Sequence, residues 1–136
     1  MSFESLGLPA ALARAVADSG YTQPTDVQTR AIPPAMAGSD LRVSSSTGSG
    51  KTAAFVLPAL TRVLAARGDA SKRRDNKTVH GPRVLVLTPT RELAMQVAKA
   101  TDSYGRHIPG LRVATIVGGV PYHAQLKALR GPLDVL

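Results

Sequence analysis

The chain has 136 residues, 43% of them apolar and only 4% aromatic, which suits a single domain with an aliphatic core. Seventeen Lys and Arg against nine Asp and Glu give a net charge of +8, which favours a polyanionic partner such as nucleic acid, or a basic surface without a partner. The lack of cysteine excludes disulfides and thiolate metal sites. With no long apolar run and no signal peptide, we expect a cytoplasmic protein without a membrane partner.

Two helices are predicted near the N-terminus. The alanine-rich stretch Pro9 to Ser19 carries a proline suited to a first helical turn and precedes Gly20, where a helix would stop. Thr25 is a good N-cap for the second helix. Pro33 and Pro34 must bend or end that helix, because proline lacks the backbone N–H donor.

Residues Ser44 to Thr52 read S-S-S-T-G-S-G-K-T and lie between a short apolar segment and a predicted helix. Glycines in such a loop let successive N–H groups point into one concavity, and the helix adds the positive end of its dipole. Lys51 can then reach the β and γ phosphates of a nucleotide, and the Thr52 hydroxyl can ligate Mg²⁺. The full pattern has glycine where this chain has Ser45, so a Ser/Gly-rich turn that happens to precede a lysine is the alternative. The predicted nucleotide-binding loop comprises Ser45, Ser46, Thr47, Gly48, Ser49, Gly50, Lys51 and Thr52.

The rest of the chain alternates apolar runs with helical patterns. Continuous apolar runs without polar alternation are typical of strands buried on both faces of a parallel sheet. The predicted strands are 41–43, 83–87, 113–117 and one beginning at 133, and the predicted helices are 51–66, 89–104 and 122–129. Residues 67–82 are polar and basic, and predict a solvated loop that either only connects or adds attraction to nucleic acid. The three histidines, His80, His107 and His123, are interpreted as surface residues.

This alternation predicts an α/β fold with a parallel, helix-covered sheet and right-handed crossovers. Ligands of such sheets bind at the carboxyl ends of the strands. The phosphate loop, Thr88 to Arg91, and Gly118-Gly119 should therefore converge on one edge of the sheet.

Four motifs in this order resemble the N-terminal RecA-like domain, a P-loop NTPase fold, of the DEAD-box ATP-dependent RNA helicases. Gly20 to Gln28 is similar to the adenine-reading Q motif, and an isolated aromatic, Phe3, precedes it as in the family. Ser45 to Thr52 is similar to the loop A-x-T-G-S-G-K-T. Pro89 to Ala94 reads P-T-R-E-L-A, as the family motif does, and Gly118-Gly119 corresponds to the family's glycine doublet.

The resemblance implies ATP as the nucleotide. An amide such as Gln28 can pair bidentately with N6 and N7 of adenine, which guanine cannot satisfy. Tyr21 would stack on the base, with Phe3 packing nearby. The alternatives are that Gln28 is an ordinary exposed helix residue and that Phe3 is a core residue.

The resemblance also implies RNA as a partner. Pro89, Thr90, Arg91, Gly118 and Gly119 would hold the RNA backbone, because glycines permit close approach and arginine pairs with phosphate. Such contacts carry no sequence information. The alternative for this segment is a solvated helix N-terminus.

Two departures from the family pattern matter. Arg42 falls inside the first predicted strand, at its edge or as a strained buried charge. The chain also ends before the family's T-P-G-R, D-E-A-D and S-A-T motifs and its second RecA-like domain. We therefore expect an N-terminal fragment, with a Q-motif helical segment in 1–38 and a RecA-like domain, incomplete at its C-terminal side, in 39–136.

Three functions remain open at this point. The resemblance implies a parent enzyme that hydrolyses ATP to separate RNA duplexes, and we expect this chain alone neither to hydrolyse ATP nor to unwind RNA. The alternatives are a stand-alone nucleotide- and RNA-binding module without catalysis, and a P-loop NTPase of another branch.

Overall fold

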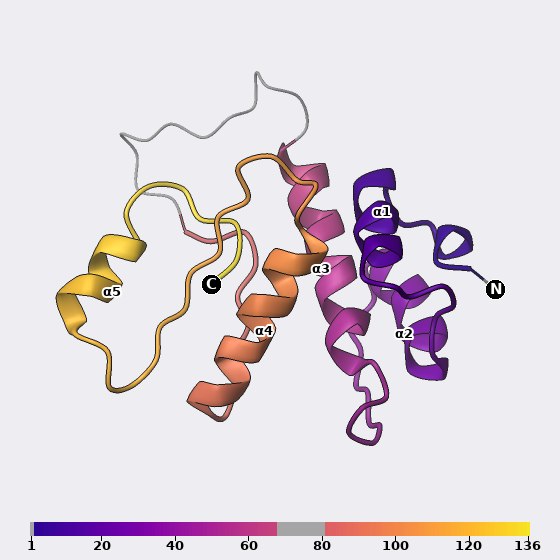
Figure 1. Ribbon diagram of the computed structural model, residues 1–136, viewed down its shortest axis with the longest axis horizontal. Helices are drawn as coiled ribbons and strands as arrows, with labels where there is room; N and C mark the ends of the chain where they lie inside the picture. Colours follow the sequence, from indigo (N-terminus) through magenta and orange to yellow (C-terminus); the bar gives the residue numbers. More distant parts are fainter. Residues whose placement is uncertain (1, 68–80) are drawn as a thin grey trace.

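The computed structural model describes residues 2–67 and 81–136, so most of the predicted basic loop lies outside it (Figure 1). The elements are the short 3-10 helix η1 (Glu4–Leu6) and the helices α1 (Ala10–Asp18), α2 (Asp26–Met36), α3 (Lys51–Arg67), α4 (Arg91–Tyr104) and α5 (Tyr122–Ala128). All five α-helices were predicted to within about two residues at each end. The 3-10 turn was not predicted. In the part of the chain that the structure covers, no helix is long and apolar enough to cross a membrane.

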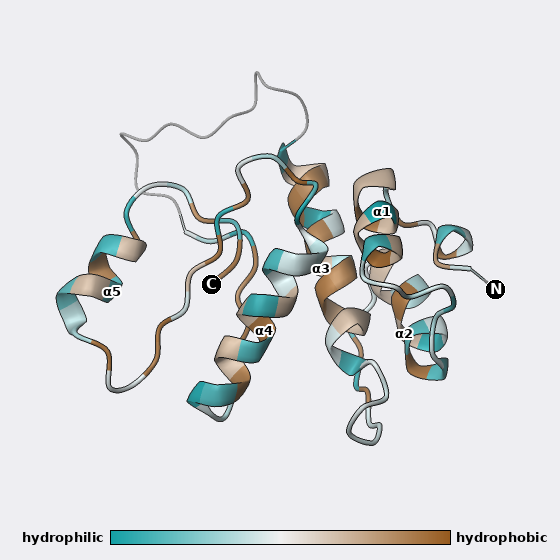
Figure 2. Ribbon diagram, in the orientation of Figure 1, coloured by the Kyte–Doolittle hydropathy of each residue, from teal (hydrophilic) through white to brown (hydrophobic). Residues whose placement is uncertain are grey.

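Helix α3 is the central element of the fold. It packs against α1 and α2 on one side and against α4 on the other (Figure 1). Its buried residues Ala54, Leu57, Leu60 and Val63 recur every three positions, and Figure 2 shows apolar stretches, in brown, along its ribbon. The largest fully buried side chains are Leu12, Val16, Ile32, Leu57, Leu60 and Val63. Because α3 begins directly at the phosphate loop, this packing holds the loop against the rest of the molecule. Phe55 is an apolar residue of α3 that is exposed.

Helix α2 continues through both of its prolines. Pro33 and Pro34 each remove one N–H donor, yet the carbonyls of these prolines still accept bonds from Ala37 at 3.0 Å and Ser39 at 3.0 Å. The prolines lie within the last four residues of the helix, so only its last turn loses N–H donors. The helix therefore ends after Met36 and not at the prolines.

The predicted parallel sheet appears only as single bridges among the described residues. Val135 bridges Val84 on one side and Val113 on the other, both in the parallel sense. Hydrogen bonds of 2.9 Å from Val84 N to Asp134 O and of 3.0 Å from Leu136 N to Val84 O set this register. The last segment of the chain therefore lies between the two earlier ones. The direction and neighbours of these segments fit a parallel sheet, but the prediction of four extended strands is wrong for this structure.

The apolar run 83–87 is covered on one face only. Val84 and Val86 pack against the core, whereas Leu85 is 60% exposed and Leu87 84% exposed. The segment 41–43 makes no bridge within the described ranges, and its residues, Arg42 included, are exposed. Arg42 is therefore not a strained buried charge. A run of apolar residues indicates that burial would be favourable, but a second layer must be present to bury the other face.

Candidate nucleotide and nucleic-acid site

The predicted phosphate loop, Ser45 to Thr52, runs straight into α3, which begins at Lys51. Gly48 has φ +78° and Gly50 has φ +90°, a backbone conformation that residues with a Cβ rarely adopt. The Lys51 ammonium donates a hydrogen bond of 2.6 Å to Ser45 O, so the side chain folds back over its own loop. A phosphate oxygen would compete with this carbonyl for the same ammonium group.

Gln28 joins helix α2 to the phosphate loop. Its Nε2 donates to Gly50 O at 3.2 Å, and its Oε1 accepts from Thr25 N at 2.9 Å. The side chain is buried, with 6% of its residue surface exposed. The interpretation of Gln28 as an ordinary exposed helix residue is therefore wrong. Both ends of the amide are engaged within the protein, so pairing with a base requires these bonds to be exchanged.

Gly50 is needed for this contact as well as for its backbone angle. A Cβ at position 50 would collide with the amide of Gln28 and would lie 2.9 Å from Thr25 Oγ1. Thr25 is a residue whose part in the site was missed, since the sequence indicated only its role as N-cap. The T-x-x-Q spacing was the available signal, because it is the pattern of a capping box, which Thr25 and Gln28 form here.

The donors of the loop fit a polyphosphate. Ser49 Oγ is buried and makes no hydrogen bond within the described part of the chain. An unpaired buried hydroxyl is costly unless a ligand meets it. Lys51 adds a positive charge, and the N-terminus of α3 adds unpaired N–H groups. Thr52 is partly buried in the first turn of α3, where its hydroxyl would be the group to hold Mg²⁺. No group of three His, Cys, Asp or Glu residues able to hold a metal is found in residues 2–67 and 81–136.

The structure places the two predicted adenine-site aromatics beside one another. Phe3 is a buried member of the core, as its alternative interpretation had it. It also lines a hollow of about 300 Å³ together with Tyr21 and Thr22. Tyr21 is 54% exposed and borders a second hollow on the side of α4.

Arg91 contacts the glycine doublet Gly118-Gly119. Arg91 Nη1 donates to Gly118 O at 3.3 Å, and a Cβ on Gly119 would lie 2.9 Å from the same nitrogen. Thr90 caps α4, its Oγ1 accepting from Leu93 N at 3.1 Å. Pro89 precedes this cap and is exposed. The residues predicted to contact RNA backbone are thus brought together by α4 and the 118–119 turn, and the guanidinium is exposed.

Asp134 lies outside this site. Its buried carboxylate accepts hydrogen bonds from Arg67 Nη2 at 2.7 Å and from Arg112 N at 3.0 Å, and it forms an ion pair with Arg83, whose Nε lies 3.5 Å away. It joins the end of α3 to two of the apolar segments. The sequence offered no signal for this cluster, because its members are far apart in the chain.

His107 is more than a surface residue. Its Nε2 lies 2.5 Å from Asp18 Oδ2, and this hydrogen bond holds the pKa of the Asp18 carboxyl below its usual value. His123 is exposed, as predicted, and His80 lies outside the described residues.

A glycine loop that opens a buried helix, with a lysine and a threonine at its end, is the arrangement typical of the P-loop class of proteins. The family model described as DEAD/DEAH box helicase matches residues 25–136. The chain belongs to this family.

The known proteins to which the chain is similar also belong to this family. It is 44% identical, over 98% of its length, to DEAD-box ATP-dependent RNA helicase 52A of Oryza sativa subsp. japonica. Among solved structures, it is similar over its whole length to a DEAD box protein from Methanococcus jannaschii, with a TM-score of 0.82 and 33% identity, covering 34% of that chain. It is also similar over 98% of its length to the RNA helicase Prp28 from Chaetomium thermophilum bound to ADP, with a TM-score of 0.80 and 37% identity, covering 31% of that chain.

These neighbours have the RecA-like fold that the sequence predicted, while the described part of this chain is rich in helix. The chain spans about a fifth of the length of its curated relatives, 23% of the rice helicase and 19% of the helicase DeaD of Klebsiella pneumoniae.

Proposed function

We propose that this chain is the nucleotide-binding part of a DEAD-box RNA helicase, which binds ATP and Mg²⁺, holds RNA by its backbone, and couples ATP hydrolysis to local separation of RNA strands. The observation that carries the proposal is the hydrogen bond from Gln28 Nε2 to Gly50 O. It places the proposed base-reading amide in direct contact with the proposed phosphate loop. An occupant of both would be a nucleotide.

Lys51 has the central part in phosphate binding. Its ammonium leaves Ser45 O and pairs with the β and γ phosphates, where a positive charge stabilises the charge that develops during phosphoryl transfer. The Thr52 hydroxyl would hold Mg²⁺, which would neutralise charge on the phosphates. The loop from Ser45 to Gly50 presents its N–H groups and the free Ser49 hydroxyl to the remaining oxygens.

Base selection falls to the residues around α2. Gln28 exchanges its bonds to Thr25 N and Gly50 O for adenine N6 and N7, and Tyr21 stacks on the ring, with Phe3 behind it. Because the same amide contacts Gly50 O, binding of a base at Gln28 breaks a hydrogen bond to the phosphate loop and so affects the phosphate site directly.

RNA is held at the N-terminal end of α4. The exposed Arg91 guanidinium pairs with a phosphate, while Thr90 and the Gly118-Gly119 turn let the backbone approach closely. We assign residues 1–38 to the base-reading segment and 39–136 to the RecA-like part. Turnover and unwinding belong to a longer protein with a second RecA-like domain. A cytoplasmic location stays a prediction from the sequence.

Calorimetric titration of the chain with ATP and GTP tests the proposal. We expect tighter binding of ATP, and we expect Gln28→Ala to abolish that preference while inorganic tripolyphosphate still binds. Gln96→Ala, which removes an exposed amide on α4 outside the base-reading motif, is the matched control and should leave the preference unchanged. Equal affinity of the unmodified chain for ATP and GTP would contradict the proposal.

A further inference from the structure

Two side chains contact the backbone at the Gly118-Gly119 turn, one from each side of it in the sequence. Arg91 Nη1 donates to Gly118 O at 3.3 Å, and Gln125 Oε1 accepts from Val117 N at 2.7 Å. Arg91 belongs to the proposed RNA site. Gln125, which lies on α5, has no role in anything described above.

The backbone around this turn has few hydrogen bonds of its own. Ala114 N donates to Val135 O at 3.0 Å, and this is the last backbone–backbone hydrogen bond before the turn in the described part of the chain. From 115 to 120, the bonds to Arg91 and Gln125 are the only hydrogen bonds made within residues 2–67 and 81–136. A segment with so few bonds opens easily, so its position depends on these two side chains.

Helix α5 is itself fixed by polar contacts to the segment that leads to the turn. None of its residues is buried, and it stands apart from the other helices (Figure 1). The Arg112 guanidinium donates to Ala128 O at 3.3 Å, Arg130 O at 2.7 Å and Pro132 O at 2.9 Å, which secures the C-terminal end of α5. Gln125 is the second point at which the helix is bonded to this segment.

RNA binding would leave the bond to Gln125 as the main support of the turn. A phosphate oxygen would compete with Gly118 O for the Arg91 guanidinium. The bond from Val117 N to Gln125 is not exposed to this competition, because Val117 N is a donor and the phosphate is an acceptor that Arg91 meets with its own donors. A turn that is held in advance also loses less entropy when the RNA backbone binds.

We propose that Gln125 is a positioning residue for RNA binding: through Val117 N it holds the Gly118-Gly119 turn at the place where Arg91 and the RNA backbone meet. The inference rests on the proposed function, since it takes Arg91 and this turn as the RNA site. Gln125 acts through the turn and has no charge of its own.

The test measures affinity for single-stranded oligo(U) by fluorescence anisotropy at several salt concentrations. We expect Gln125→Ala to weaken binding about two- to tenfold, the range of one hydrogen bond. The slope of log affinity against log salt should fall by up to about 0.7, the value for one phosphate contact. Because glutamine is neutral, its removal lowers the slope only if it displaces the phosphate contact of Arg91. In an Arg91→Gln background, Gln125→Ala should therefore weaken binding no further.

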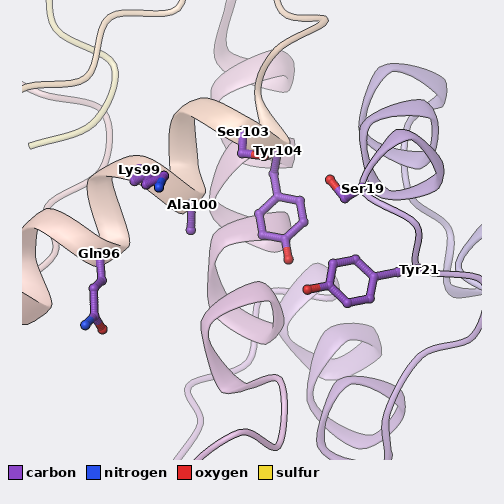
Figure 3. Close-up of a pocket in the computed structure, with 7 residues that line it drawn as sticks. All are labelled: Ser19, Tyr21, Gln96, Lys99, Ala100, Ser103 and Tyr104. Carbon is purple, nitrogen blue, oxygen red and sulfur yellow. The ribbon is translucent and has the colours of Figure 1, made fainter.

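Gln96→Ala is the matched control. It removes an exposed amide from α4 whose side chain makes no hydrogen bond within the described residues, and which lines the hollow beside Tyr21 (Figure 3). RNA affinity and salt slope should both be unchanged. ATP affinity should be unchanged in Gln125→Ala, because α5 and the phosphate loop lie apart (Figure 1).

A second readout follows the contact without RNA. We expect the Val117 N–H to exchange with solvent faster in Gln125→Ala, because its acceptor is lost. Gln125→Glu should keep the slower exchange, since a carboxylate oxygen of the same reach still accepts this bond. NMR-detected hydrogen exchange measures all three chains. Equal exchange in the unmodified chain and in Gln125→Ala would overturn the inference.

The outcomes separate the two proposals. If the unmodified chain does not bind oligo(U), or if Arg91→Gln leaves the salt slope unchanged, the RNA part of the proposed function fails and this inference with it. If Arg91→Gln lowers the slope but Gln125→Ala changes neither affinity nor slope, only the inference is overturned. Additive losses would mean that Gln125 contacts RNA itself, and a parallel loss of ATP affinity would mean a general loosening of the fold. Either result would overturn the inference too.

Discussion

At the scale of single residues, the phosphate loop shows two separate reasons for glycine. Gly48 has a positive φ with open space where a Cβ would be, whereas Gly50 has a positive φ and also faces the Gln28 amide. We therefore expect Gly48→Ala to lower the free energy of unfolding by about 1–2 kcal/mol through backbone strain alone. Gly50→Ala should cost about 1 kcal/mol more, because it also breaks the contact with Gln28. Urea unfolding of the two variants measures both values.

Gly7→Ala extends this comparison outside the loop. Gly7 has a positive φ and open space around it, and it lies far from the loop in the sequence, so its cost should match that of Gly48→Ala. Equal destabilisation by Gly48→Ala and Gly50→Ala would contradict the collision that the structure implies at position 50.

At the scale of elements, Asp134 connects the end of α3 to the two apolar segments that begin near Arg83 and Arg112. Its carboxylate is nearly buried and is satisfied by Arg67 and by the backbone N–H of Arg112. Removing one partner of a buried pair leaves the other charge uncompensated. We expect Asp134→Ala to lower the free energy of unfolding by about 3 kcal/mol, since Arg67 and Arg83 would face one another without an anion. Chemical denaturation measures this loss.

Asp102→Ala is the control for this element. Asp102 is an exposed carboxylate on α4, and its removal should change the unfolding free energy by no more than about 0.5 kcal/mol. A similar, small loss for both variants would mean that the Asp134 cluster adds nothing to the junction.

At the scale of the whole molecule, the net charge of +8 and the exposed Arg91 bear on RNA binding. Backbone contacts release counterions, so we expect affinity for single-stranded RNA to fall steeply with salt and to be the same for oligo(A) and oligo(U). Arg91→Gln should reduce the slope of log affinity against log salt by about 0.7, the value for one phosphate contact on a single strand. Fluorescence anisotropy at several salt concentrations measures the slope.

Arg30→Gln controls for the loss of one positive charge. Arg30 is exposed on α2, which lies on the other side of α3 from α4, and its removal should leave the slope unchanged (Figure 1). A strong preference for one RNA sequence, or equal slopes for the Arg91 variant and the unmodified chain, would contradict the assignment of Arg91 to the RNA backbone.

The sequence by itself determined the local features of this protein. The helices followed from apolar periodicity and from signals such as the N-cap Thr25, and a candidate phosphate loop was indicated by its glycines and by Lys51. These signals are local, because a helix satisfies its own hydrogen bonds and a cap lies within a few residues of the groups it serves.

Only the tertiary structure decided which surfaces meet. It buried Gln28 against Gly50, gathered Arg67 and Arg112 around Asp134, and left Leu87 exposed although its run of apolar residues predicted burial. The physical reason is that a strand, unlike a helix, takes its hydrogen bonds and its covering layers from segments far away in the chain. Apolar character indicates which residues gain from burial, but only the folded arrangement provides the partners that bury them.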